Sequence, residues 1–139
     1  MHKRSLAAIA LVTLLAACAG PGTRDSTDPL VLIGIDKLSS SAGGDCMVNV
    51  TLVNRVHDTD WDGVSYHLSL LNKAGKTAGR LMGAPRKPVA YGRELLDSGR
   101  VQGVRCEDIA GAEVIYLGYY PAGKAQVSVH NRRVRVQVK

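Results

Sequence analysis

The residues with the clearest potential for metal chemistry are three aspartates at alternate positions: Asp58, Asp60 and Asp62. With Gly63 after them, they match the first half of a calcium-binding loop, in which oxygens supply about six to eight ligands. The twelfth loop position, where a bidentate Glu belongs, is Ser69, which lies in an expected strand. The pattern therefore favours an acidic loop between two strands, with Trp61 packed over its end, and a calcium site is the weaker alternative.

Enzymatic chemistry is not indicated by the remaining polar residues. A catalytic triad needs a nucleophile held against a histidine and a carboxylate. His57, His67 and His130 stand apart in the sequence, and no Gly-x-Ser-x-Gly segment is present. We therefore expect a protein that is not an enzyme and that has no cofactor and no evident small-molecule substrate.

Basic residues dominate the end of the chain, where no acidic residue follows Glu113. The candidate partner-binding residues are Arg132, Arg133, Arg135 and Lys139. They would form a contact strip for an anionic partner or a lipid headgroup. The alternative is that these charges only keep an edge strand from pairing with other sheets.

The overall composition points to acidic or phosphate-rich partners rather than to nucleic acid. The chain has 139 residues, with 18 Lys and Arg against 12 Asp and Glu. This mild positive charge suits headgroups, cell-wall polymer or an acidic protein. The chain has no Phe and one Trp, so no platform for stacking nucleic-acid bases is visible.

The N-terminal segment has the order of an export signal: a basic start at 2–4, an apolar run at 6–15, then small residues. The apolar run is shorter than the roughly 20 residues that span a membrane. Leu15-Ala16-Ala17-Cys18 resembles the lipobox of bacterial lipoproteins. The resemblance implies a signal peptide at 1–17 and acylation of Cys18, palmitate included. Ala19 after the anchor implies outer-membrane sorting, with the domain facing the periplasm.

The remaining cysteines, Cys46 and Cys106, form an even pair in a chain expected to be exported. No Cys-x-x-Cys spacing and no neighbouring histidine favours metal ligation or a catalytic thiol, which are the alternatives. An oxidising compartment favours a disulfide between them.

The cleaved chain divides into a lipidated, Gly- and Pro-containing tether at 18–29 and a domain at 30–139. The domain has a β pattern, because apolar residues recur at every second position in 46–52 and again in 64–70. Further strands are expected at 30–35, 77–82, 101–106 and 112–120, the last covered on both faces. Residues 92–98 are expected to form a short helix or a loop.

The last segment changes the phase of its valines between Val129 and Val134. A hairpin with Asn131-Arg132 as its loop would pair these two valines and project Arg133 and Arg135 into solvent together. One long strand with a bulge is the alternative. These elements predict an all-β, antiparallel β-sandwich of about seven to eight strands with one disulfide.

Residues 46–75 are similar to FxLYD-type immunoglobulin-like modules of bacterial envelope proteins. In both, a strand ends in Val-Asn (Val53-Asn54 here), Val64 opens a long strand, and 72–75 makes a turn. Residues 66–72 lack the Phe and the Leu-Tyr-Asp signature. The resemblance implies an immunoglobulin-like sandwich and a non-catalytic module, and it specifies no ligand.

Together these features predict a lipid-anchored interaction module that assists an envelope machine, such as a secretion system or cell-wall synthesis. The alternative is a protein inhibitor of a lysozyme-like enzyme. Such inhibitors insert a Ser/Gly-rich loop or an acidic group into the enzyme cleft, and the candidates are Ser39–Gly44 and Asp58–Asp62. The basic charge of this chain would oppose binding to a basic lysozyme.

Overall fold

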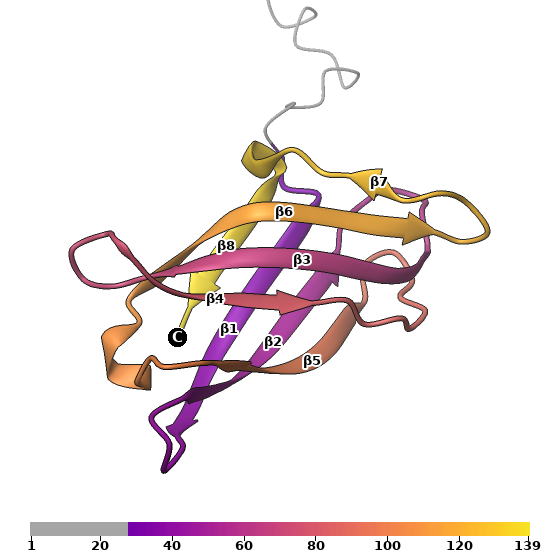
Figure 1. Cartoon of the computed structure of the whole chain (residues 1–139). Coiled ribbons are helices and arrows are strands. Elements are labelled where there is room, and N and C mark those ends of the chain that lie inside the picture. The colour runs from indigo at the N-terminus through magenta and orange to yellow at the C-terminus, as the bar shows by residue number, and fades with distance from the viewer. Residues whose placement is uncertain (1–27) are drawn as a thin grey trace, which may run out of the picture.

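A computed structural model describes residues 28–139. The expected signal peptide and residues 18–27 of the expected tether, Cys18 included, lie outside the described residues. The described chain forms eight strands and two short 3-10 helices (Figure 1). The strands are β1 Val31–Ser40, β2 Cys46–Asn54, β3 Trp61–Leu71, β4 Thr77–Gly83, β5 Glu94–Val101, β6 Gly111–Pro121, β7 Val127–Ser128 and β8 Val134–Val138. The 3-10 helices are η1 Cys106–Asp108 and η2 Asn131–Arg133.

The strands form two four-stranded sheets, which confirms the predicted all-β sandwich. Sheet A has the order β5-β2-β1-β8, and sheet B has the order β4-β3-β6-β7. All pairs are antiparallel except β1 with β8. In Figure 1, β1, β2 and β8 of sheet A run diagonally behind sheet B, and β5 lies below β4.

The alternating pattern of β2 and β3 sets the core, as the sequence predicts. In β2 the residues from Cys46 to Leu52 at even positions are buried, and in β3 the even positions from Val64 to Leu70 are buried. Trp61 is fully buried and stacks on Tyr119 of β6, with ring centroids 5.4 Å apart. The apolar residues of both sheets therefore meet in one core.

Glycines allow β4 and β5 to approach closely at one side of the sandwich. A Cβ at Gly99 of β5 would lie 2.6 Å from the Leu81 side chain of β4. A Cβ at Gly79 would lie 2.8 Å from the side chain of Val101. Because carbon atoms pack at about 3.5–4.0 Å, only glycine leaves room for these contacts.

Two segments differ from their predicted structures. Residues 94–101 form strand β5 rather than a helix or loop, because they pair with β2 from Val53 to Cys46. Residues 102–105 form no strand: the chain turns at 102–103, and η1 follows at Cys106. Strand β6 is confirmed. The prediction that both faces of this strand are buried is wrong, because Ile115 and Tyr116 are exposed.

The predicted C-terminal hairpin is wrong, and so is its alternative of one bulged strand. Strand β7 pairs with β6 in sheet B, whereas β8 pairs with β1 in sheet A. Helix η2 carries the chain between the sheets. The change of valine phase therefore marks a change of sheet.

The predicted disulfide is confirmed. Cys46 begins β2 and is fully buried, and its sulfur is bonded to that of Cys106 in η1. The backbone N–H of Cys106 donates to the hydroxyl of Ser40 at 3.0 Å. The bond thus ties sheet A to the connection between β5 and β6, closing a loop with a sequence separation of 60.

A partly buried hydrogen bond also joins the two sheets. The hydroxyl of Tyr66 in β3 donates to a carboxylate oxygen of Asp97 in β5 at 2.8 Å. Burial raises the pKa of Tyr66 far above its usual range, and the hydrogen bond to Asp97 and its negative charge raise it further. A Cβ at Gly83 would lie 2.5 Å from the Tyr66 hydroxyl, so this glycine also makes room for the pair.

We expect the double variant Cys46→Ala/Cys106→Ala to lose about 4 kcal/mol of unfolding free energy, because the unfolded chain gains loop entropy. Urea denaturation of the unlipidated chain measures this loss. Cys18→Ala is the matched control, since it removes a cysteine outside the disulfide. Equal denaturation midpoints for the double variant and the control would contradict the prediction.

We expect Tyr66 to make the fold less stable in alkali. The unfolded chain releases the tyrosine proton at roughly pH 10, while the folded chain retains it, so stability falls as the pH rises above that value. This residue contributes a slope of up to about 1.4 kcal/mol per pH unit, which Tyr66→Phe removes. Urea denaturation between pH 9 and 11 measures it, with the exposed Tyr91→Phe as control. The same slope in wild type and Tyr66→Phe would refute this role.

Candidate partner-binding face

The four basic residues predicted as one strip occupy two places in the structure. Arg132 and Arg133 lie in η2, where the Arg133 side chain is half-buried and its Nε donates to the carbonyl of Asp28 at 2.8 Å. Arg135 and Lys139 lie on and just beyond β8, and both are exposed. Arg133 therefore holds the first described residues, and the exposed charges that remain on β8 are Arg135 and Lys139.

Arg135 and Lys139 lie on the outer face of sheet A because successive side chains of β8 point to opposite faces of the sheet. Val134, Val136 and Val138 pack against the core, so Arg135, Gln137 and Lys139 turn outward. Register places Arg135 beside Leu32 of β1 and Gln137 beside Gly34. Lys139 continues the ladder, because its N–H donates to the carbonyl of Ile35 at 2.8 Å.

This outer face has a shallow depression of about 390 Å³ over Gly34. Gly34 pairs with Thr51 of β2, and a Cβ at Gly34 would lie 3.9 Å from the Cβ of Thr51, an ordinary contact. The other lining residues are contributed by four strands and include Leu32, Asp36, Val53, Glu94, Arg135, Gln137 and Lys139. We call these residues, with Gly34 and Thr51, the sheet A face.

The charges of the sheet A face are available to a partner. Among residues 28–139, the ion pairs within 4.0 Å are His57–Asp58, Asp45–Arg100 and Arg105–Glu107. Arg135 and Lys139 are in none of them. Strand β8 is also at the edge of its sheet, so backbone donors and acceptors lie beside the basic side chains. The face also carries Asp36 and Glu94, so its basic groups are concentrated at β8, where an extended segment can make side-chain and backbone contacts.

The three aspartates of the candidate calcium loop bind separate groups. Asp60 accepts a hydrogen bond from the N–H of Tyr91 at 3.3 Å, and Asp62 accepts one from the N–H of Gly123 at 3.2 Å. Asp58 pairs with His57 at 3.3 Å. Within residues 28–139, no three His, Cys, Asp or Glu residues are grouped so as to hold a metal ion. The carboxylates here brace loops.

The histidines are equally dispersed. The His57 ring lies edge-on to the Tyr91 ring, and Nδ1 of His130 accepts a hydrogen bond from the N–H of Arg132. Nε2 of His67 is buried without a hydrogen-bond partner. In the described part of the chain, none of these imidazoles is hydrogen-bonded to a serine, threonine or cysteine side chain. The structure brings no nucleophile and base together around them.

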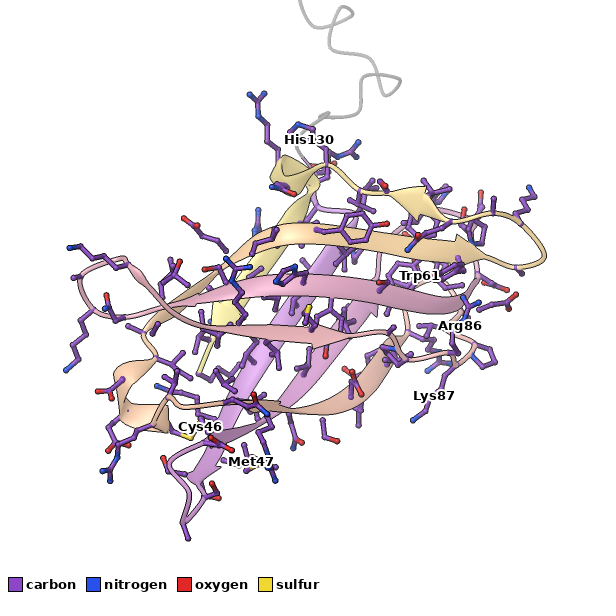
Figure 2. The ribbon with its side chains drawn as sticks, viewed as in Figure 1. Cys46, Met47, Trp61, Arg86, Lys87 and His130 are labelled. Carbon is purple, nitrogen blue, oxygen red and sulfur yellow. A yellow bond between two sulfur atoms is a disulfide. The ribbon has the colours of Figure 1, made fainter. Side chains whose placement is uncertain are left out.

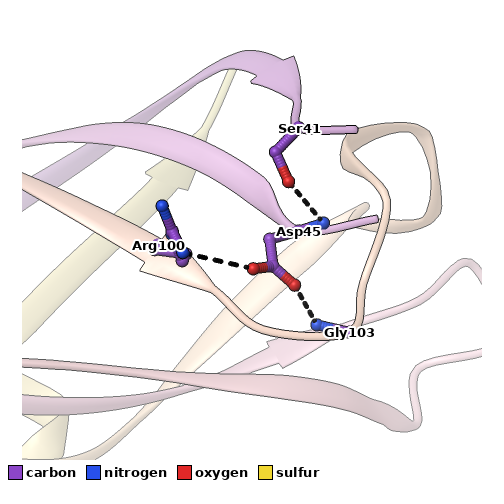
Figure 3. Close-up of polar contacts among 4 residues, drawn as sticks. All are labelled: Ser41, Asp45, Arg100 and Gly103. Carbon is purple, nitrogen blue, oxygen red and sulfur yellow. Dashed lines mark hydrogen bonds and ion pairs between the residues drawn. The ribbon is translucent and has the colours of Figure 1, made fainter. Parts of the chain in front are cut away.

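The predicted loop at Ser39–Gly44 begins later in the structure, because Ser39 and Ser40 still belong to β1 and pair with Met47 and Cys46. Residues 41–45 close the β1–β2 hairpin, which projects beyond β5 in Figure 1. Its base is braced by Asp45, whose carboxylate accepts a hydrogen bond from the N–H of Gly103 at 2.8 Å and pairs with Arg100 at 3.6 Å (Figure 3). Ser41 accepts a hydrogen bond from the N–H of Asp45 through its hydroxyl, at 3.2 Å. The loop is thus a projecting element with a fixed base.

Sequence reasoning missed several members of the sheet A face, among them Gly34, Asp36 and Gln137. Gln137 had a visible signal, because it shares the alternation that turns Arg135 outward. Gly34 interrupts an apolar strand, which is a signal of a gap in a sheet surface. No local signal showed that β8 would lie beside β1.

Comparison with known proteins shows a shared fold. No protein-family model matches the chain, and no curated protein matches it significantly. IrmA from Escherichia coli has a similar structure, with a TM-score of 0.54 at 18% identity over 77% of this chain and 92% of that one. An exo-β-N-acetylglucosaminidase from Vibrio harveyi gives a TM-score of 0.46 at 12% identity, over 78% of this chain and 18% of the enzyme. Within residues 28–139, no helix is long and apolar enough to cross a membrane.

Proposed function

We propose that this protein is a non-enzymatic interaction module, lipid-anchored in the outer membrane and facing the periplasm. It serves as an accessory or assembly factor of an envelope machine, such as a secretion system or a cell-wall synthesis complex. The lipobox-like Leu15–Cys18 segment supports the anchor. The fold, with its confirmed disulfide, is compatible with an oxidising compartment.

The observation that carries the interaction role is the sheet A face. Arg135 and Lys139 are exposed and free of ion pairs within residues 28–139, and they stand beside the open edge of β8. A guanidinium group binds a carboxylate through two parallel hydrogen bonds, which fixes the orientation of the bound group. An extended partner segment would add backbone hydrogen bonds to β8 and place an acidic side chain against Arg135.

The proposed anchor would let a small binding face hold its partner. A tethered domain meets a partner in the same membrane at a raised effective concentration, so a weak interface gives stable occupancy. Each buried methylene of the lipid contributes about 0.8 kcal/mol, so several acyl chains hold the protein at the membrane.

The projecting Ser39–Gly44 loop supports a second candidate function, the inhibition of a lysozyme-like enzyme. Its small residues would enter a cleft, and the bonds of Asp45 to Gly103 and Arg100 would keep the loop in place. A fixed loop loses little conformational entropy on binding, which favours tight association.

We expect Arg135→Glu/Lys139→Glu to abolish the cross-linking of a partner in cells, because both cationic contacts become repulsive. Cross-linking followed by mass spectrometry measures this, and thermal denaturation checks that the fold remains. Lys73→Glu/Lys76→Glu, in the β3–β4 turn, is the charge-matched control. An unchanged cross-linking pattern in the first variant would reject the sheet A face.

A second variant tests the same face without a change of charge. Gly34→Val fills the depression, and an added Cβ meets no atom closer than 3.9 Å. Valine also suits a strand better than glycine, so stability should rise by about 0.5–1 kcal/mol while the partner is lost. Retained cross-linking in a correctly folded Gly34→Val protein would also argue against the face.

We expect inhibition of a lysozyme-like enzyme to depend on the projecting loop. A lytic assay with lysozyme and whole cell walls should show inhibition by the wild-type protein. Replacing the exposed tip residues Ala42 and Gly43 by Glu should then abolish it, because bulky charges no longer fit the cleft while the bonds at the base of the loop remain. Full lysis in the presence of excess wild-type protein would exclude this function.

A further inference from the structure

We infer that one end of the sandwich, where the described chain begins, docks on anionic lipid headgroups through Arg55, Arg93 and Arg132. The inference rests on the proposed lipid anchor and adds to it an orientation for the domain. We call these three residues the basic row. It is distinct from the sheet A face, which contains none of them.

The basic row is built by the backbone of sheet A. The N–H of Asn54 donates to the carbonyl of Arg93 at 3.0 Å, and the N–H of Arg55 donates to that of Leu30 at 2.9 Å. The N–H of Leu30 in turn donates to the carbonyl of Arg133 at 2.7 Å. Neighbouring strands lie about 4.8 Å apart, so these arginines line an end roughly 15 Å wide. Helix η2 and the start of β1 are side by side there, at the top of Figure 1, and His130 marks the same end in Figure 2.

The backbone that carries the row is fixed by a buried side chain. Asn54 is fully buried, and its amide nitrogen donates to the carbonyls of Thr59 at 2.7 Å and Val89 at 3.1 Å. Its amide oxygen accepts a hydrogen bond from the N–H of Val56 at 2.9 Å. Asn54 also exchanges backbone hydrogen bonds with the turn that contains Arg93. The turns that carry Arg55 and Arg93 are therefore both fixed by this asparagine.

The row consists of three cationic side chains that are not bound within the described fold. All three of its side chains are exposed, and none takes part in an ion pair within residues 28–139. Arg133 adds a fourth charge at the same end while it holds Asp28. The acids at this end are Asp58 and Glu94, which lie close in sequence to Arg55 and Arg93, Asp60, which accepts the N–H of Tyr91, and Asp28, which contacts Arg133.

A phosphate headgroup is the partner that the position of the row favours. The expected tether of residues 18–27 would reach roughly 35 Å when fully extended, and it joins the domain at Asp28, beside the row. An anchor at Cys18 therefore brings this end of the sandwich to the membrane first. Electrostatic attraction acts within about 8 Å at physiological salt, and arginine binds phosphate through paired hydrogen bonds.

Docking of the row would orient the rest of the domain. Strand β1 runs away from this end for 10 residues, so the Ser39–Gly44 loop lies roughly 33 Å further from the headgroups. The sheet A face would stand between the two ends, with the edge of β8 open to the side. Both candidate binding elements would remain accessible to partners.

The test uses the full, lipidated protein in vesicles of phosphatidylcholine alone or mixed with phosphatidylglycerol. Hydrogen exchange should slow in 55–57, 91–93 and 130–133 only with the anionic lipid, and high salt should reverse it. Each arginine near an anionic surface changes the docked population roughly fivefold. Arg55→Glu/Arg93→Glu/Arg132→Glu should lose the protection, and Lys73→Glu/Lys76→Glu/Arg80→Glu should keep it.

The outcomes separate the anchor from the basic row. Flotation with neutral vesicles, together with incorporation of labelled palmitate, reports the anchor alone. A protein that floats with both kinds of vesicle but shows equal exchange in both overturns the basic row and leaves the anchor intact. Loss of protection in the Lys73/Lys76/Arg80 variant also overturns it, since attraction would then follow net charge. A protein that floats with neither overturns the anchor and, with it, the docking.

Discussion

The close approach of β4 to β5 is the constraint on which the shape of this sandwich depends. Gly79 and Gly99 let core side chains of one sheet contact the backbone of the other, and Gly83 leaves space for the bond between Tyr66 and Asp97. This side of the molecule is therefore sealed. On the opposite side, β8 is the last strand of sheet A, so its edge is open. The sheet A face covers the outer surface of the sheet and extends to this edge.

The carboxylates and the basic groups of the described chain have different roles. Asp45, Asp60 and Asp62 each accept a backbone N–H from a distant loop, and Asp97 accepts the Tyr66 hydroxyl. These acids are held by the fold, whereas many basic side chains extend into solvent. The formal net charge of the full chain is +6, and the cations are the more exposed part of it. This division favours acidic segments and phosphate groups as partners over metal ions.

Local patterning predicted the parts of the fold that depend on local burial. The alternation in β2 and β3, the turn at 72–75 and the cysteine pair were all readable, because each reflects one buried face or one covalent bond. Strand β5 was missed because its pairing with β2 overrides a weak local preference. The place of β8 was missed because its partner, β1, is about a hundred residues away in the sequence. The same distance explains why Arg133 and Arg135 were grouped together, although η2 separates their environments.

The parallel pairing of β8 with β1 has a consequence for the order of assembly. Synthesis proceeds from the N-terminus, so β1 and β2 are complete long before the last strand exists. During that time the backbone groups on one edge of β1 have no partner strand. The pairing of β1 with β8 that satisfies them closes a long loop, which has an entropic cost. The unpaired edge of β1 is therefore free to pair with other chains until β8 has been synthesised. A chain that terminates before β8 would expose this edge and aggregate through it.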